Sequence, residues 1–122
     1  MEKFITKNKS YLTGFLKFMG LKRENIVNGR LENRIKAQKF VYFGKKFGLP
    51  LDYDFDLYLY GPYSSKLADD YYNMTKKEWY EGFLNIPEEK KRVLLYLKGL
   101  NALDLEIAAT LDSIQRRHDL IT

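Results

Sequence analysis

The sequence predicts a mainly helical domain with a small β element, an α+β fold of about five to six helices. Apolar residues recur every three or four positions over several stretches, whereas strict alternation of apolar and polar residues occurs in one stretch, residues 52–60. The helix–strand–helix order around that stretch leaves a winged-helix-like arrangement open. The chain of 122 residues can bury one core, so we expect a single domain over residues 1–122.

The first half of the chain predicts two helices. A polar N-cap segment precedes a run of apolar residues at helical spacing that Gly20 ends, so we expect a helix over residues 11–19. A second helix is expected over residues 31–47, after a turn at residues 28–29. Apolar residues cover most of its circumference, which confines its lysines to a narrow sector. The lysines expected in that sector are Lys36, Lys39 and Lys46.

Gln38 is a polar residue on an apolar line of the second helix, together with Leu31, Ile35 and Tyr42. Burying an amide without hydrogen-bond partners costs roughly 1–3 kcal/mol. We therefore expect Gln38 to bond a nearby backbone end, with the turn at Gly61 as the candidate, and to serve the structure first.

The alternating stretch predicts a half-buried strand. The residues expected on its buried face are Phe55, Leu57 and Leu59. A strand needs a partner, and residues 83–86 or the N-terminal segment are the candidates. Gly61 and Pro62 are expected to end the strand, with Pro62 in the first turn of a helix that Ser64 or Ser65 caps.

The second half of the chain predicts further helices. One follows the serines and carries Leu67, Tyr71 and Met74, and residues 76–83 form a short helix or a turn. Another begins near Asn85 and ends at Gly99. A last helix begins after Asn101. Its apolar positions are Leu103, Ile107, Leu111 and Ile114.

The net charge of +5 is unevenly distributed. Residues 1–50 hold 12 Lys or Arg against 3 Asp or Glu, a balance of +9, whereas residues 51–81 hold 3 against 7, and residues 82–122 hold 6 against 6. A basic segment can attract a phosphate backbone or an acidic protein, or an acidic segment of the same chain can neutralise it within the fold. The sequence leaves both outcomes open.

The absence of cysteine excludes disulfide frameworks, thiolate zinc sites and cysteine nucleophiles, and it suits a reducing compartment. The N-terminus lacks the apolar run of a signal peptide, and no later run approaches the ~20 apolar residues of a membrane helix. We therefore expect a cytoplasmic protein that has no membrane partner.

Residue types with catalytic or metal-binding chemistry lack a supporting pattern. Asp52, Asp54 and Asp56 have the opening spacing of a calcium loop, but Leu57 and Tyr63 stand where that loop needs Gly and Glu. No Ser-His-Asp or Cys-His set surrounds the single histidine, and there is no Gly-rich phosphate loop. We expect no enzyme activity, no cofactor and no metal; an unrecognised enzyme is the third hypothesis.

Basic and aromatic side chains are the candidates for a binding surface. The 10 tyrosines suit a protein-binding surface as well as a core with wet edges. The basic side chains can follow a phosphate backbone or form a solvated face. The candidate surface residues are Arg34, Lys36, Lys45, Lys46, Tyr58, Tyr63 and Tyr71.

Three ordered motifs carry a resemblance to a known family. They are Lys36-Ala37-Gln38-Lys39-Phe40-Val41-Tyr42-Phe43, Tyr60-Gly61-Pro62-Tyr63-Ser64 followed by Leu67-Ala68-Asp69-Asp70, and Leu105-Glu106-Ile107-Ala108-Ala109-Thr110. With these motifs the chain resembles the Panacea (SocA-like) antitoxin domain and the related YwgA-like proteins, with Ala37 in place of the family's usual Leu. The resemblance marks as motif residues Gln38, Lys39, Tyr42, Tyr60, Gly61, Pro62 and Ser64.

The resemblance implies a mostly helical domain with a small sheet, no known catalysis, and a place in toxin–antitoxin, phage or plasmid contexts. Members of the family look like protein-binding modules that neutralise a partner or present it to a protease. We therefore expect a non-enzymatic, antitoxin-like domain that occludes or presents a protein partner, with a toxin as the candidate. The alternative is a winged-helix-like DNA-binding protein, motivated by the basic first segment.

Overall fold

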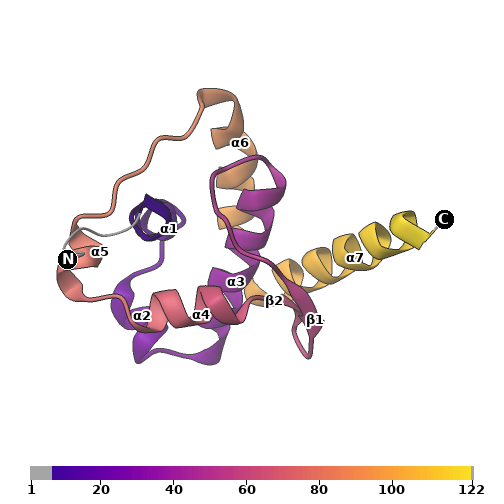
Figure 1. The fold of residues 1–122 in the computed structure, drawn as a ribbon, viewed down its shortest axis with the longest axis horizontal. Helices are drawn as coiled ribbons and strands as arrows, with labels where there is room; N and C mark the ends of the chain where they lie inside the picture. The colour runs from indigo at the N-terminus through magenta and orange to yellow at the C-terminus, as the bar shows by residue number, and fades with distance from the viewer. Residues whose placement is uncertain (1–6, 122) are drawn as a thin grey trace.

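The computed structural model describes residues 7–121. These residues form seven helices and one small antiparallel sheet (Figure 1), which confirms the predicted α+β class. The elements are α1 (Lys7–Phe18), α2 (Arg23–Val27), α3 (Leu31–Lys46), β1 (Asp56–Tyr58), β2 (Gly61–Tyr63), α4 (Ser65–Tyr72), α5 (Lys76–Tyr80), α6 (Glu88–Lys98) and α7 (Ala102–Ile121). The short helix α2 and the strand β2 are the elements that the sequence did not predict.

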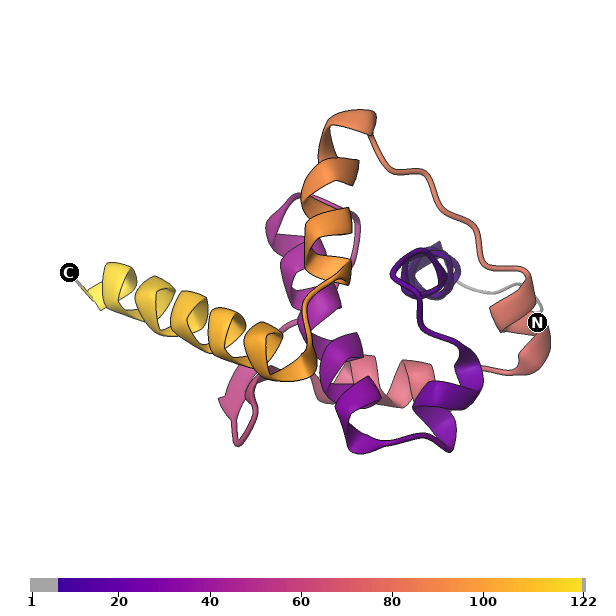
Figure 2. The same ribbon diagram turned by 180° about the vertical axis from the view of Figure 1, so that it is seen from behind.

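Helix α3 is the centre of the fold. It contacts α1, α2, α6, α7 and β2, and it runs through the middle of the body in both ribbon views (Figures 1 and 2). An unbroken segment of this helix, residues 37–44, is buried. The predicted helix with apolar residues on most of its sides is therefore surrounded by its neighbours. The largest fully buried side chains around it include Leu12, Phe15, Leu16, Leu51, Tyr53, Leu67, Met74, Leu94 and Leu105.

The β element is a hairpin rather than a long strand. Strand β1 covers three residues and pairs with β2, with Asp56 opposite Tyr63 and Tyr58 opposite Gly61. The predicted partner at residues 83–86 is therefore wrong, and the N-terminal candidate lies outside the described residues. The cause is Gly61, whose φ of +89° is readily adopted by glycine and lets the chain fold back at once.

The turn also corrects two residue assignments. Leu59, expected on the buried face, lies at the hairpin tip and is 91% exposed. Pro62, expected in the first helical turn, lies in β2, where a short edge strand tolerates its missing N–H. Helix α4 begins after Ser64, whose Oγ accepts a hydrogen bond from the Leu67 amide at 3.1 Å, so the predicted serine cap is confirmed.

Helix α7 leaves the body. Its first turns pack against α3 and β2, and its C-terminal part extends away from the other helices (Figures 1 and 2). Leu105 and Ala109 face the core. The four apolar positions that predicted this helix lie on the solvent side instead. In the described part of the chain, no helix combines the length and apolar character needed to cross a bilayer.

Candidate functional site

Helix α3 holds the hairpin and the start of α4 through two polar side chains. The Gln38 amide donates to the Ser64 carbonyl at 3.0 Å, and its oxygen accepts from the Ser64 backbone N–H at 2.8 Å. The predicted bond from Gln38 to a backbone end is confirmed, with Ser64 rather than Gly61 as the partner. The Lys39 Nζ donates to the Pro62 carbonyl at 2.9 Å. Gln38 and Lys39 together form what we call the polar clasp.

Lys39 lies in the core, with 1% of its surface exposed, so its expected place in an exposed lysine sector is wrong. Burial lowers the pKa of Lys39 to about 8, against an opposing effect of the Glu106 carboxylate. A lysine in this position fixes the hairpin backbone and cannot reach a ligand in solution. The resemblance motif therefore contains a structural cation.

Gly61 is needed for close approach as well as for its backbone conformation. A Cβ atom at this position would lie 2.3 Å from the Thr110 Oγ1 of α7. The hairpin base and α7 are thus in direct contact, and three motif residues, Gly61, Pro62 and Ser64, are explained by packing and hydrogen bonding rather than by ligand binding.

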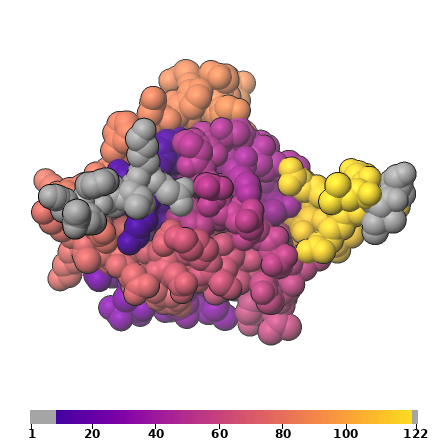
Figure 3. All heavy atoms as spheres, in the orientation of Figure 1, coloured from indigo at the N-terminus to yellow at the C-terminus, as the bar shows by residue number. Residues whose placement is uncertain are grey.

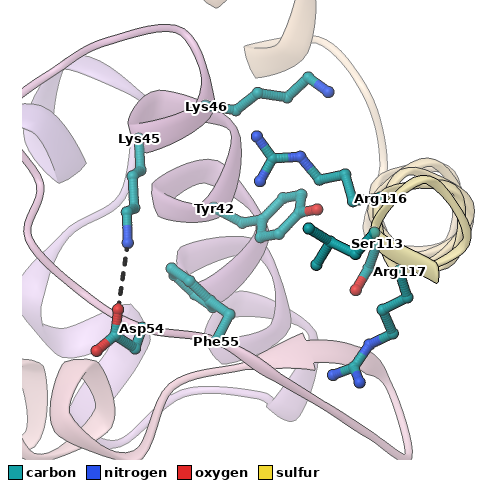
Figure 4. Close-up of a pocket in the computed structure, with 9 residues that line it drawn as sticks. Tyr42, Lys45, Lys46, Asp54, Phe55, Ser113, Arg116 and Arg117 are labelled. Carbon is teal, nitrogen blue, oxygen red and sulfur yellow. Dashed lines mark hydrogen bonds and ion pairs between the residues drawn. The ribbon is translucent and has the colours of Figure 1, made fainter. Parts of the chain in front are cut away.

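A basic pocket of about 490 Å³ lies between the C-terminal end of α3, residues 54–55 and α7. The residues that line it are Tyr42, Lys45, Lys46, Asp54, Phe55, Ser113, Arg116, Arg117 and Leu120. Figure 4 shows the Arg116 side chain beside the Tyr42 ring with Lys46 beyond it, and Lys45 reaching toward Asp54 on the other side. Four cations and one carboxylate in this lining make the pocket a candidate for binding an anion.

Asp112 of α7 joins the two helices at the edge of this pocket. It accepts a hydrogen bond from the Tyr42 hydroxyl at 2.5 Å, pairs with Lys46, and lies 3.7 Å from the Arg116 guanidinium. Burial acts to raise the pKa of Asp112, but the bonds from Lys46 and Tyr42 and the nearby charges outweigh it and hold the pKa below its ordinary value. Burial and the Asp112 carboxylate raise the pKa of Tyr42.

The predicted basic surface is only partly available for binding. Arg34 donates to the backbone carbonyls of Ile26 and Gly29, and Lys45 donates to the Tyr53 carbonyl at 2.5 Å. Lys46 is paired with Asp112, and Lys36 is half-buried. These contacts use much of the basic charge of the first segment within the fold. Arg117 is exposed and makes no ion pair with any residue that the structure describes.

The tyrosines divide into exposed and buried members. Tyr58 and Tyr63 stack edge to face with ring centroids 5.5 Å apart, and Tyr58 and Tyr60 are largely exposed beside Leu59. Tyr71 is 2% exposed, so its expected role as a surface contact is wrong. Its hydroxyl lies 3.4 Å from the Gln38 amide, and burial raises its pKa to about 12. The helical spacing of Leu67, Tyr71 and Met74 places Tyr71 on the apolar face of α4, so its burial could have been predicted from the sequence.

The hairpin tip is therefore the part of the candidate surface that is free. A hollow of about 330 Å³ lies among Tyr58, Leu59, Tyr60, Tyr63 and Ser65. Leu59 was missed because its alternation with the tyrosines matched a buried strand face. Only the positive φ of Gly61, which a sequence does not display, moves Leu59 into a turn.

Among residues 7–121, no group of three or more His, Asp or Glu side chains could hold a metal ion. Comparison with known proteins found no family model, no curated protein and no solved structure that matches the chain. The resemblance to the Panacea and YwgA-like proteins therefore depends on the motif residues alone.

Proposed function

We propose that this protein is a non-enzymatic, antitoxin-like protein-binding domain that occludes a protein partner, and that the hairpin tip is its contact surface. The observation that supports the proposal is the exposure of Tyr58, Leu59 and Tyr60 at 59%, 91% and 43% on a projecting hairpin. Tyrosine is enriched among the residues that carry most of the binding energy of protein interfaces, and the buried centre of an interface is more apolar than the rest of the surface.

The support beneath the tip suits this role. The polar clasp holds the backbone of Pro62 and Ser64, and Thr110 of α7 packs against Gly61. Because the backbone is already fixed, binding would cost little of the conformational entropy that ordering a loop requires. A rigid hairpin that presents aromatic side chains can cover a partner's functional surface without any chemical step.

The proposal is tested by co-expressing the tagged protein with the product of the neighbouring gene and measuring complex formation and relief of growth arrest. We expect Leu59→Lys and Tyr58→Ala each to weaken the complex by about 10-fold or more, as loss of a central contact does. Leu95→Lys and Tyr96→Ala on α6 are matched controls, because these residues are 54% and 68% exposed and lie away from the hairpin.

Two results would count against the proposal. One is the absence of a complex between the wild-type protein and the neighbouring product. The other is equal binding by the hairpin variants and the α6 controls, which would place the contact elsewhere on the molecule.

The basic pocket supports a second candidate function, DNA binding. Lys45, Lys46, Arg116 and Arg117 gather around one hollow although they come from two distant segments. If they contact phosphates, the logarithm of the affinity for duplex DNA falls with that of the salt concentration, with a slope near −0.9 per phosphate. Arg117→Ala should lower that slope by about one unit. Undetectable binding at low salt rejects this candidate.

A further inference from the structure

Helix α7 has two apolar faces, and only one of them is covered. Leu105 and Ala109 face α3 and the hairpin and are fully buried. Leu103, Ile107, Leu111 and Ile114 are 62%, 48%, 63% and 51% exposed. At 100° per residue the two sets point in directions about 180° apart. We call the second set the outer stripe.

The outer stripe is a continuous feature rather than scattered exposure. Its members follow one another at spacings of four, four and three residues, the spacing of a seam between two helices. Over 11 residues the stripe runs about 16 Å along the helix at 1.5 Å per residue. An apolar row of this kind in water is typical of a protein–protein contact.

The charges beside the stripe change sign along the helix. Asp104 and Glu106 lie near its N-terminal end, and Arg117 lies near its C-terminal end, whereas Arg116 is on the opposite face of α7 beside Asp112. Because the acidic and basic ends are reversed in an antiparallel neighbour, a second α7 running the opposite way meets each end with the opposite charge. On the same edge of such a pair, Glu106 of one copy faces Arg117 of the other.

We propose that α7 pairs with α7 of a second copy of this chain, antiparallel and through the outer stripe, to form a two-fold symmetric dimer. Leu111 of both copies lies at the two-fold axis, and Ile107 of each copy packs against Ile114 of the other. The apolar row and the charged ends are then both self-complementary, as an isologous interface requires. The contact is independent of the proposed function, because it leaves the hairpin tip free.

The shape of the molecule permits this pairing. The C-terminal part of α7 stands clear of the body in the space-filling view (Figure 3), and the outer stripe points away from α3 and the hairpin. The body of each copy therefore lies on the far side of its own α7 from the seam.

The orientation is tested by cross-linking, for which a chain without cysteine is well suited. Leu111→Cys should give a disulfide-linked dimer on mild oxidation, because the two thiols meet at the axis. Leu103→Cys should not, because the two positions are about 24 Å apart along an antiparallel pair at 1.5 Å per residue. Leu95→Cys on α6 is the control for random collision. Cross-linking of Leu103→Cys equal to that of Leu111→Cys would overturn the antiparallel arrangement.

The association itself is measured by sedimentation equilibrium of the full chain. We expect the wild type to dimerise, Leu111→Lys to weaken the dimer by about 100-fold or more because two like charges meet at the axis, and Leu95→Lys to have no effect. Arg117→Glu should weaken it by about 10-fold, because Glu106 of the other copy then meets a like charge. Far-UV circular dichroism checks that each variant is folded. A wild type that remains monomeric up to millimolar concentration would overturn the proposal.

Discussion

Helix α3 buries polar side chains, whereas helix α7 exposes apolar side chains to solvent. Helix α3 buries an amide and an ammonium group, Gln38 and Lys39, with 2% and 1% of their surface exposed. Helix α7 leaves Leu103 and Leu111 more than 60% exposed. Neighbours decide the difference: α3 has contacts with four helices and a strand, whereas α7 packs against α3 and β2.

A polar group is tolerated in the core when a backbone carbonyl or amide lies within hydrogen-bond distance of it. Gln38 and Lys39 each meet a carbonyl or amide of residues 62–64, so their burial leaves no hydrogen bond unmade. An apolar row on the surface has no such internal partner in the described chain. The buried polar pair therefore serves the fold, and the exposed apolar row is available to another molecule.

The largest expected effect compares the two faces of α7. Leu105→Ala should lower the free energy of unfolding by about 2–5 kcal/mol, because it leaves a cavity in the core. Leu111→Ala should change it by no more than about 0.5 kcal/mol, as substitutions of exposed residues usually do. Both values come from urea unfolding in dilute solution, where the proposed dimer is dissociated. Equal losses would mean that the outer stripe is packed within the monomer.

The next prediction tests the contact that Asp112 makes between α3 and α7. Asp112→Ala should cost about 1.5–3 kcal/mol, the range for hydrogen bonds to a charged group, because Tyr42 and Lys46 both lose their partner. The exposed Asp119→Ala is the control. Since the folded-state pKa of Asp112 is lowered, its contribution is present at neutral pH and is lost as the pH falls through that pKa. A pH-independent difference between wild type and variant from pH 7 down to pH 2 would contradict this account.

A smaller loss is expected in the polar clasp. Gln38→Leu keeps the size of the side chain but leaves the buried Ser64 N–H without its acceptor, which costs about 1–3 kcal/mol. The Ser64 carbonyl keeps its bond from the Ala68 amide, so the groups that lose a partner are the Ser64 N–H and the Tyr71 hydroxyl. Gln115→Leu on the exposed part of α7 is the matched control, with an expected change within about 0.5 kcal/mol. Gln38→Leu as stable as Gln115→Leu would show that the clasp is dispensable.

Much of the fold was predictable because helical periodicity and capping are local properties. The boundaries of α3, the Ser64 cap and the backbone bond of Gln38 follow from residues close in sequence or from the cost of an unpaired amide. The prediction of α1 was wrong at its start: the helix begins at Lys7 rather than at residue 11, so the polar segment predicted to cap it lies within the helix. The hairpin was not predictable in the same way, because the alternation around Leu59 is compatible with a longer strand and the fold-back depends on the φ of Gly61.

The candidate site was less predictable than the fold. The basic pocket joins Lys45 and Lys46 to Arg116 and Arg117, which are about 70 residues away in the chain, and no local pattern reports that distance. The outer stripe was visible as a helical pattern, but a pattern shows that a helix has an apolar face and not whether a neighbour covers it. Lys39 is a charged residue that is buried, and the sequence did not predict this because a lysine close to other lysines in the sequence gives no sign of burial.

The contribution of Lys39 to the free energy of unfolding is expected to depend on pH and is measured as a function of pH. Its pKa in the folded state, about 8, lies below the ordinary value of about 10.4 in the unfolded chain, so between these values the unfolded state binds more protons. The free energy of unfolding should therefore rise from pH 8 to pH 10, by no more than about 1.4 kcal/mol per pH unit for one proton. In Lys39→Met this contribution is absent. Above pH 10 both proteins should lose stability, because burial raises the pKa of Tyr53 and Tyr71 in the folded state while the unfolded tyrosines ionise. The difference between the two urea-unfolding curves at each pH isolates Lys39, and parallel pH profiles would mean that this lysine titrates as if it were in water.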